Sequence, residues 1–197
     1  MNDEDTRVFW RNRIFIVYIF LLGFVNVGSV TACDIASAGT TMYFDDSGNG
    51  IQVWSELIDN KYYVIKSSLY DMDRGWLEPE IISPDNISCE NPVLAVSQDW
   101  NCLIAWVYVD PELGYNRLCV MTKLAGMPWG KYQEISVPEE RVISKSYKLV
   151  VDNSNRILLL WDSLIDAEEP IVFRQIGRSC QSSFGGSWSE PQTIRQY

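Results

Sequence analysis

Three stretches of the chain decide the fold: MYFDDSGNGIQVW at residues 42–54, VLAVSQDWNCLIAW at residues 93–106 and KLVVDNSNRILLLW at residues 148–161. Each consists of a short apolar run, a polar turn and a second apolar run that ends in tryptophan. This pattern predicts two antiparallel strands joined by a tight turn. The tryptophans Trp54, Trp106 and Trp161 are spaced by 52 and 55 residues, and periods of this size are typical of repeat folds.

A second tryptophan series, Trp76, Trp129 and Trp188, follows the first in the same register. A third apolar run lies between the two series in each repeat, at residues 62–65, 118–121 and 171–173. Each repeat therefore predicts four short strands. We expect these six tryptophans to pack in the core and between repeats, and we do not interpret them as a sugar site.

The second strand of each repeat is apolar on both of its alternating faces, so it needs cover on both sides. Four-stranded sheets stacked face to face provide that cover, and they describe the blades of a propeller. The sequence thus predicts an all-β fold, a partial β-propeller of three four-stranded blades of about 50 residues each. We place the domain at residues 34–197 and its repeats at about 41–83, 92–138 and 147–197.

Two motifs resemble the repeats of bacterial exported β-propeller proteins. They are the Phe44-Asp45-Asp46-Ser47-Gly48-Asn49 turn that leads to Trp54, and the Gly-x-Trp-x-x-Pro motif around Trp188 and Pro191. The resemblance implies a scaffold whose roles vary. The Asp-box of sialidases is distantly similar, but Gly48 and Trp54 are six residues apart here instead of three.

Three blades make half a ring, because propellers typically close with 4 to 8 blades. The two outer faces of such a stack would leave apolar sheet surface exposed. We expect a head-to-tail homodimer to close six blades. Docking on the open sheet of a protein partner, or descent from a longer propeller gene, are the alternatives.

The charge balance and the missing histidines exclude several function classes. The chain has 16 Lys and Arg against 26 Asp and Glu, a net charge of -10 and no histidine. An acidic chain is a poor partner for nucleic acid, and a chain without histidine lacks the usual general base and metal ligand. We expect no catalytic residues, metal or cofactor. The Asp45 turn carries oxygen ligands suited to calcium, but side-chain bonds to its own backbone explain it without a metal.

The N-terminus carries a predicted export signal. Arg7, Arg11 and Arg13 precede an apolar segment at residues 14–30, and Val30-Thr31-Ala32-Cys33 resembles a bacterial lipobox. We interpret residues 1–33 as a signal peptide or membrane anchor with Cys33 as the candidate for lipid attachment. The protein is then a membrane-anchored lipoprotein, periplasmic or at the cell surface, or is secreted. A buried helix of a cytosolic protein is the alternative.

Export would make disulfides possible among the remaining cysteines, Cys89, Cys102, Cys119 and Cys180. The favoured pair is Cys102 with Cys119, since both fall on strands predicted to be adjacent. The alternative is that these cysteines are buried thiols that act as small hydrophobic residues.

The sequence favours a non-enzymatic, exported or membrane-anchored binding scaffold that associates with itself or with a protein partner. A carbohydrate-binding propeller or a degenerate sialidase-like glycosidase is the alternative, followed by a hydrolase with an unrecognised pair of carboxylates. Binding would lie on the segments that differ between repeats, Asp110–Tyr115, Asp162–Pro170 and Gly177–Gly186, with Tyr115 and Phe184 as aromatic candidates.

Overall fold

The described part of the chain is built from strands. The computed structural model describes residues 40–167 and 172–196, which contain fourteen strands and no helix long and apolar enough to cross a membrane. The predicted signal or anchor at residues 1–33, including Cys33, lies outside the described residues.

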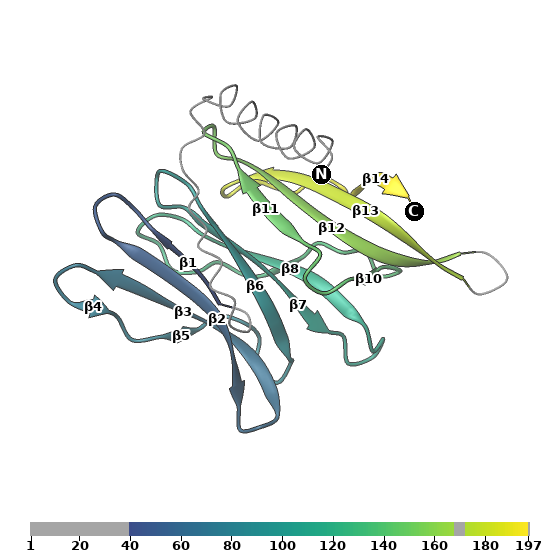
Figure 1. Ribbon diagram of the computed structural model, residues 1–197, viewed down its shortest axis with the longest axis horizontal. Helices are drawn as coiled ribbons and strands as arrows, with labels where there is room; N and C mark the ends of the chain where they lie inside the picture. Colours follow the sequence, from purple (N-terminus) through teal and green to yellow (C-terminus); the bar gives the residue numbers. More distant parts are fainter. Residues whose placement is uncertain (1–39, 168–171, 197) are drawn as a thin grey trace, which may run out of the picture. The chain divides into compact units, whose positions relative to one another are not determined.

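The strands form three antiparallel sheets, which we call blades 1, 2 and 3 (Figure 1). Blade 1 contains β1 (Thr40–Phe44), β2 (Gly50–Ile58), β3 (Tyr62–Asp71), β4 (Gly75–Trp76) and β5 (Glu80–Ile81). Blade 2 contains β6 (Cys89–Val96), β7 (Cys102–Val109), β8 (Asn116–Lys123) and β9 (Gln133–Glu134). Blade 3 contains β10 (Arg141–Val142), β11 (Lys148–Val151), β12 (Arg156–Ala167), β13 (Val172–Ser183) and β14 (Gln192–Gln196).

Each blade has four strand positions. In blade 1, β4 and β5 both pair with β3, so together they occupy the fourth position; in blade 3, β10 and β11 both pair with β12 and occupy the first. The predicted fold class, a partial β-propeller of three four-stranded blades, is confirmed.

The first strands of the blades, β1, β6 and β11, lie next to one another (Figure 1). A β-bulge in β6 joins them: Asn91 has a φ of 55°, and the register shifts between Glu90 and Val93. The carbonyl of Asn91 accepts a hydrogen bond from the Tyr147 hydroxyl of blade 3. The carbonyl of Pro92 accepts one from Thr41 Oγ1 of blade 1, at 3.0 Å. The bulge therefore connects all three blades.

Two apolar clusters fill the spaces between blades, and both follow one rule. Trp106 of blade 2 packs on Val53 and Ile65 of blade 1. Trp161 of blade 3 packs on Leu103 and Ala105 of blade 2. We name the side of a blade that carries the β2, β7 or β12 tryptophan its tryptophan face and the opposite side its aliphatic face. In each interface a tryptophan face covers the aliphatic face of the preceding blade.

The six repeated tryptophans differ in burial according to this rule. Trp106 and Trp161 are 0% and 2% exposed, while Trp54, Trp129 and Trp188 are half-buried. Trp76 is 42% exposed. Trp54 and Trp76 lie on the tryptophan face of blade 1, which no other described blade covers.

The turn between the first two long strands is closed by its first polar side chain in every blade. Asp45 Oδ1 accepts the backbone N–H of Ser47 and Asn49 at 2.9 and 2.8 Å. Ser97 Oγ and Asp152 Oδ1 act in the same way in blades 2 and 3. The predicted turn chemistry is confirmed, because these side chains are bonded to their own backbone.

The same bonds make stability depend on pH. The backbone N–H of Arg156 is the main cause that holds the pKa of Asp152 below its usual value. A carboxyl whose pKa is lower in the folded state stabilises the fold above its unfolded pKa, and this contribution is lost as the pH falls through the folded value.

We therefore expect Asp152→Asn to destabilise the protein at pH 6 and this difference in the free energy of unfolding to be smaller at pH 3. Urea unfolding of both proteins at these two pH values measures the difference. Asn153→Ala, at the exposed position next to Asp152 in the same turn, serves as the control. An Asp152→Asn effect that is the same at both pH values would contradict the account.

The predicted disulfide is wrong. Cys102 and Cys119 do lie on adjacent strands, but Cys102 faces Lys123 and Cys119 faces Trp106, four register positions apart. At about 3.4 Å per residue this places their Cα atoms roughly 14 Å apart, whereas a disulfide needs less than about 7 Å. Cys89, Cys102 and Cys119 are free, buried thiols, as the alternative stated.

Two segments predicted as variable loops, Asp162–Pro170 and Gly177–Gly186, contain strand at residues 162–167 and 177–183. β12 continues to Ala167 and β13 to Ser183, and the two pair without interruption from Arg156 opposite Ser183 to Ala167 opposite Val172. The sequence of β13 is mostly polar after Phe173, so its apolar pattern predicts only the beginning of the strand. Long backbone pairing, rather than apolar side chains, sets the length of this hairpin.

Candidate functional site

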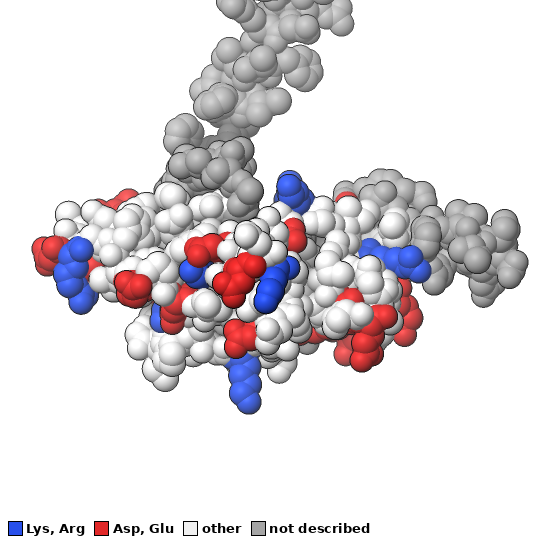
Figure 2. All heavy atoms as spheres, turned by 90° about the horizontal axis from the view of Figure 1, so that it is seen from below, with Lys and Arg blue, Asp and Glu red and all other residues white. Residues whose placement is uncertain are grey.

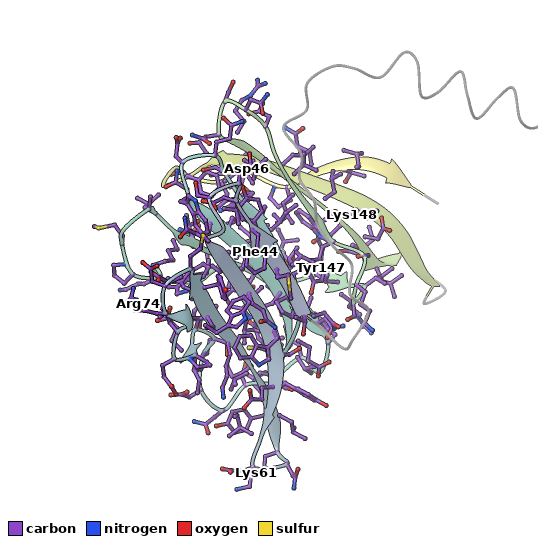
Figure 3. All side chains as sticks on the ribbon, turned by 60° about the vertical axis from the view of Figure 1, so that its left-hand side comes forward. Phe44, Asp46, Lys61, Arg74, Tyr147 and Lys148 are labelled. Carbon is purple, nitrogen blue, oxygen red and sulfur yellow. The ribbon has the colours of Figure 1, made fainter. Side chains whose placement is uncertain are left out.

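A groove of about 480 Å³ lies between blades 1 and 2 at the end where their first turns are. Figure 3 marks this end of blade 1 with Asp46, while Lys61 marks the opposite tip of the β2–β3 hairpin. The volume of this groove falls within the range of small-ligand pockets. The groove is lined by Asn49, Gly50, Leu69, Tyr70, Asp71, Arg74, Leu77, Trp100, Cys102, Lys123 and Gly126.

Trp100 is the unusual residue of this groove. It sits in the turn of blade 2 with a φ of 61°, where blades 1 and 3 have Gly48 and Asn155, also at positive φ. Glycine and asparagine adopt this left-handed conformation readily, but a bulky residue there is a true outlier that costs about 1–3 kcal/mol. The surrounding structure must therefore hold Trp100 in place.

Two contacts to blade 1 hold the indole. Its Nε1–H donates to Asp45 Oδ2 at 2.8 Å. Its ring meets the ring of Tyr43 edge to face, with centroids 5.9 Å apart. These contacts fix one aromatic ring at the wall of the groove, and strained residues of this kind are concentrated at ligand-binding sites.

An ion pair forms another part of the groove. Arg74 Nη2 lies 3.1 Å from Asp71 Oδ2, and Asp71 Oδ1 accepts the backbone N–H of Asp73 and Arg74. The hydrogen bond from the Arg74 side chain is the main cause that holds the pKa of Asp71 below its usual value. The carboxylate and the guanidinium are thus both charged at neutral pH, and the two backbone N–H groups orient the carboxylate.

Lys123 and Cys102 complete the polar lining. The ammonium of Lys123 donates to the carbonyl of Met127. Burial raises the pKa of the Cys102 thiol to about 12, so the thiol is protonated at neutral pH and is a poor nucleophile. The groove therefore offers charges and hydrogen-bonding groups for binding, without an activated nucleophile.

The lining residues do not form the catalytic pair of a glycosidase. Asp71 is the one carboxylate among them, whereas glycoside hydrolysis requires two carboxyl groups across the substrate. In residues 40–167 and 172–196, no group of three or more Cys, Asp or Glu residues is placed to hold a metal ion.

The two aromatic residues that the sequence suggested for binding make contacts within the fold, and neither lines this groove. The hydroxyl of Tyr115 donates to the carbonyl of Pro138, and the Arg141 guanidinium lies 5.2 Å from the centre of its ring. Phe184 packs on the apolar cluster between blades 2 and 3. The sequence analysis missed Trp100, although it offered a signal: this tryptophan stands outside both repeated series, in a turn where the other blades have Gly and Asn.

On the face drawn in Figure 2, charged side chains of the described residues do not form a single patch. Figure 2 shows one face of the molecule, on which acidic and basic side chains are interspersed among uncharged areas. Among the described residues drawn there, no continuous basic area crosses that face.

Comparison with known proteins shows the fold alone. No family model and no curated protein matches the chain. Among solved structures, the GH93 alpha-L-arabinofuranosidase of Fusarium graminearum in complex with arabinobiose is similar, with a TM-score of 0.52 and 11% identity over 80% of this chain and 50% of that chain. The endo-arabinase from Bacteroides thetaiotaomicron gives a TM-score of 0.48 and 15% identity over 78% and 60%.

The chain thus spans about half the length of the arabinofuranosidase that it matches. It corresponds to part of a β-propeller glycosidase fold. At 11% identity the match assigns no role to any residue of this chain.

Proposed function

We propose that this protein is a non-catalytic, carbohydrate-binding β-propeller protein that holds a neutral sugar in the groove between blades 1 and 2. The observation that carries the proposal is the indole ring of Trp100. The backbone of this residue is strained, and Asp45 and Tyr43 fix its ring at the wall of that groove. A ring that is already immobilised binds a ligand without losing further rotamer freedom.

The remaining lining groups suit a sugar. An indole ring presents a large apolar surface on which the C–H groups of a pyranose or furanose ring can pack. The fixed Asp71 carboxylate accepts hydrogen bonds from hydroxyl groups, and the Arg74 guanidinium donates to them. These two charges compensate each other, and the Lys123 ammonium adds a further hydrogen-bond donor that the hydroxyl groups of a sugar can meet.

The nature of the similar proteins supports the choice of the first probe. The Fusarium graminearum enzyme is an arabinofuranosidase whose structure contains arabinobiose. Arabinose-containing oligosaccharides are therefore the first ligands to test on this chain, alongside a general panel of neutral glycans. Export by residues 1–33 would place the groove where such glycans occur.

Trp100→Gly is expected to weaken glycan binding at least tenfold while the fold is retained. Glycine adopts a φ of 61° without strain, which offsets the lost hydrogen bond to Asp45, so the free energy of unfolding should change by less than about 1 kcal/mol. Glycan-array binding and titration calorimetry with the full chain in mild detergent measure the affinity, and urea unfolding measures the stability.

Tyr63→Ala is the matched control, because Tyr63 is an exposed aromatic residue at the opposite end of β3, beside the hairpin tip. It should bind glycans like the wild type. Equal binding by wild type and Trp100→Gly, or no glycan bound by the wild type, would contradict the proposed function.

The proposal also expects no hydrolysis of arabinan or of the other glycans that bind. Release of reducing ends by the purified chain, abolished by Asp71→Asn, would show that the protein is an enzyme after all. The lack of histidine and the single carboxylate of the groove are the reasons for expecting none.

A further inference from the structure

The two outer faces of the three-blade stack are unlike ordinary protein surface. On the tryptophan face of blade 1, Phe44, Tyr70 and Trp76 form a cluster of three rings with centroids 5.3 to 5.9 Å apart. Phe44 and Trp76 are 45% and 42% exposed. Figure 3 labels Phe44 on this blade and Lys148 on blade 3.

The aliphatic face of blade 3 is the other open surface. Register pairs place Val150 beside Leu158 and Lys148 beside Leu160 on this face. Val150 is half exposed, and Leu158 and Leu160 are only half-buried. Aliphatic side chains thus line a sheet surface that no described blade covers.

Each open face carries, at its central positions, the same kind of side chain as a face that is buried inside the chain. Counting from the repeated tryptophan, Leu158 and Leu160 occupy the same positions, three and one residues earlier, as Ile51 and Val53 in blade 1. In blade 2 those positions are Leu103 and Ala105. All four of these equivalents are fully buried, and Val53, Leu103 and Ala105 lie in the clusters that contain the tryptophan of the next blade.

The open tryptophan face of blade 1 also has buried equivalents in the chain. Trp54 occupies the position of Trp106 and Trp161, which are buried against the preceding blade, yet Trp54 is only half-buried. Its natural cover is an aliphatic face such as that of blade 3. The two open faces are therefore the two halves of a third interface of the kind that already occurs twice in the chain.

Charged groups on the open tryptophan face fit this interpretation. Glu56 accepts the indole N–H of Trp54 at 3.1 Å and pairs with Lys66 at 2.6 Å. Both existing interfaces also hold charge beside their tryptophan: Arg117 is buried near Trp106, and the buried Glu140 accepts the indole N–H of Trp161. Both existing interfaces thus accommodate a buried charged group on the tryptophan face.

We propose that the tryptophan face of blade 1 binds the aliphatic face of blade 3 of a second copy, so that two copies close through two identical contacts into a ring of six blades. Trp54 of each copy then lies against Leu160 of the other, as Trp106 lies in one cluster with Val53. Because the chain spans about half of the propeller glycosidase that it matches, two copies supply the length of one whole propeller.

Charge substitutions test this contact in the full chain, kept in mild detergent. Trp54→Lys alters only the blade 1 face, and Leu160→Glu alters only the blade 3 face. In sedimentation velocity each variant alone should lose the two-copy species that the wild type forms, since both of its contacts join a charge to an apolar side chain. Leu113→Glu, at an exposed leucine in a turn of blade 2, is the matched control and should keep two copies.

Mixing the two variants gives the decisive result. A mixed pair has one contact that is wild type on both sides, and its other contact joins lysine to glutamate, so the two-copy species should return. Near-ultraviolet circular dichroism reports the packing of Trp106 and Trp161 and shows that each variant is folded. The proposal is overturned by a wild type that sediments as a single copy, by single variants that remain paired, or by a mixture that remains unpaired.

Discussion

Trp161→Ala is expected to lower the free energy of unfolding by about 3–5 kcal/mol. The indole fills the space between blades 2 and 3 and is only 2% exposed. Its loss leaves a cavity in the larger apolar cluster of the described chain. It also removes a hydrogen-bond donor from Glu140, whose carboxylate is fully buried.

Trp54→Ala, the equivalent change on the open tryptophan face of blade 1, should lower the free energy of unfolding much less. In a chain kept as a single copy by Leu160→Glu, Trp54→Ala removes a side chain that is half-buried and whose surroundings can collapse or fill with water. Urea unfolding of the two alanine variants in that background compares the same residue type at the same repeat position. Equal losses at Trp54 and Trp161 would show that the burial assigned to the two blade faces is wrong.

The second large effect concerns the buried Arg117 of blade 2 and the groups that pair with it. Arg117 is 2% exposed; its guanidinium pairs with Glu134 and donates to the carbonyl of Ser136 at 3.0 Å. Glu134 also accepts the hydroxyl of Tyr108 at 2.6 Å. Glu134→Ala leaves the buried guanidinium without its counter-charge, and such a change typically costs about 3–5 kcal/mol.

Replacing the buried Arg117 should lower the free energy of unfolding less than replacing Glu134. Arg117→Met removes the buried charge and fills the space, while Glu134 keeps access to water, so we expect a loss of about 1–2 kcal/mol. Glu139→Ala, at an exposed acid five residues further along, should change stability by less than about 0.5 kcal/mol. Chemical unfolding at pH 7 ranks the three variants by their free energy of unfolding. A smaller loss of stability for Glu134→Ala than for Arg117→Met would contradict the proposed pairing.

The architecture could be predicted because its signals are local and repeated. The turn residues Asp45, Ser97 and Asp152 each bond to their own backbone a few positions further on. The apolar positions around Trp106 and Trp161 face alternate sides of their strands, as the pleat requires. Three copies of such a pattern identify a blade without any knowledge of long-range contacts.

What the sequence could not supply is register and the contacts between blades. The adjacent strands of Cys102 and Cys119 were identified, but a shift of four positions along the same pair decides whether their sulfur atoms meet. Arg117 was not singled out, because the anion that allows its burial lies on β9, seventeen positions away.

The candidate site was missed for a similar reason. The groove collects Asn49, Asp71, Trp100 and Lys123 from four turns or strand ends of two blades, and no spacing in the sequence joins them. Trp100 could have been noticed as a bulky residue in a glycine position. Its contact with Asp45, however, crosses from one repeat to the next.

The absolute mass of the full wild-type chain, measured by light scattering after size exclusion with the detergent contribution subtracted, tests the central claim most directly. Three blades with complementary outer faces predict a species of twice the single-chain mass found by mass spectrometry in the same sample. A folded species of one chain mass would contradict ring closure by two copies.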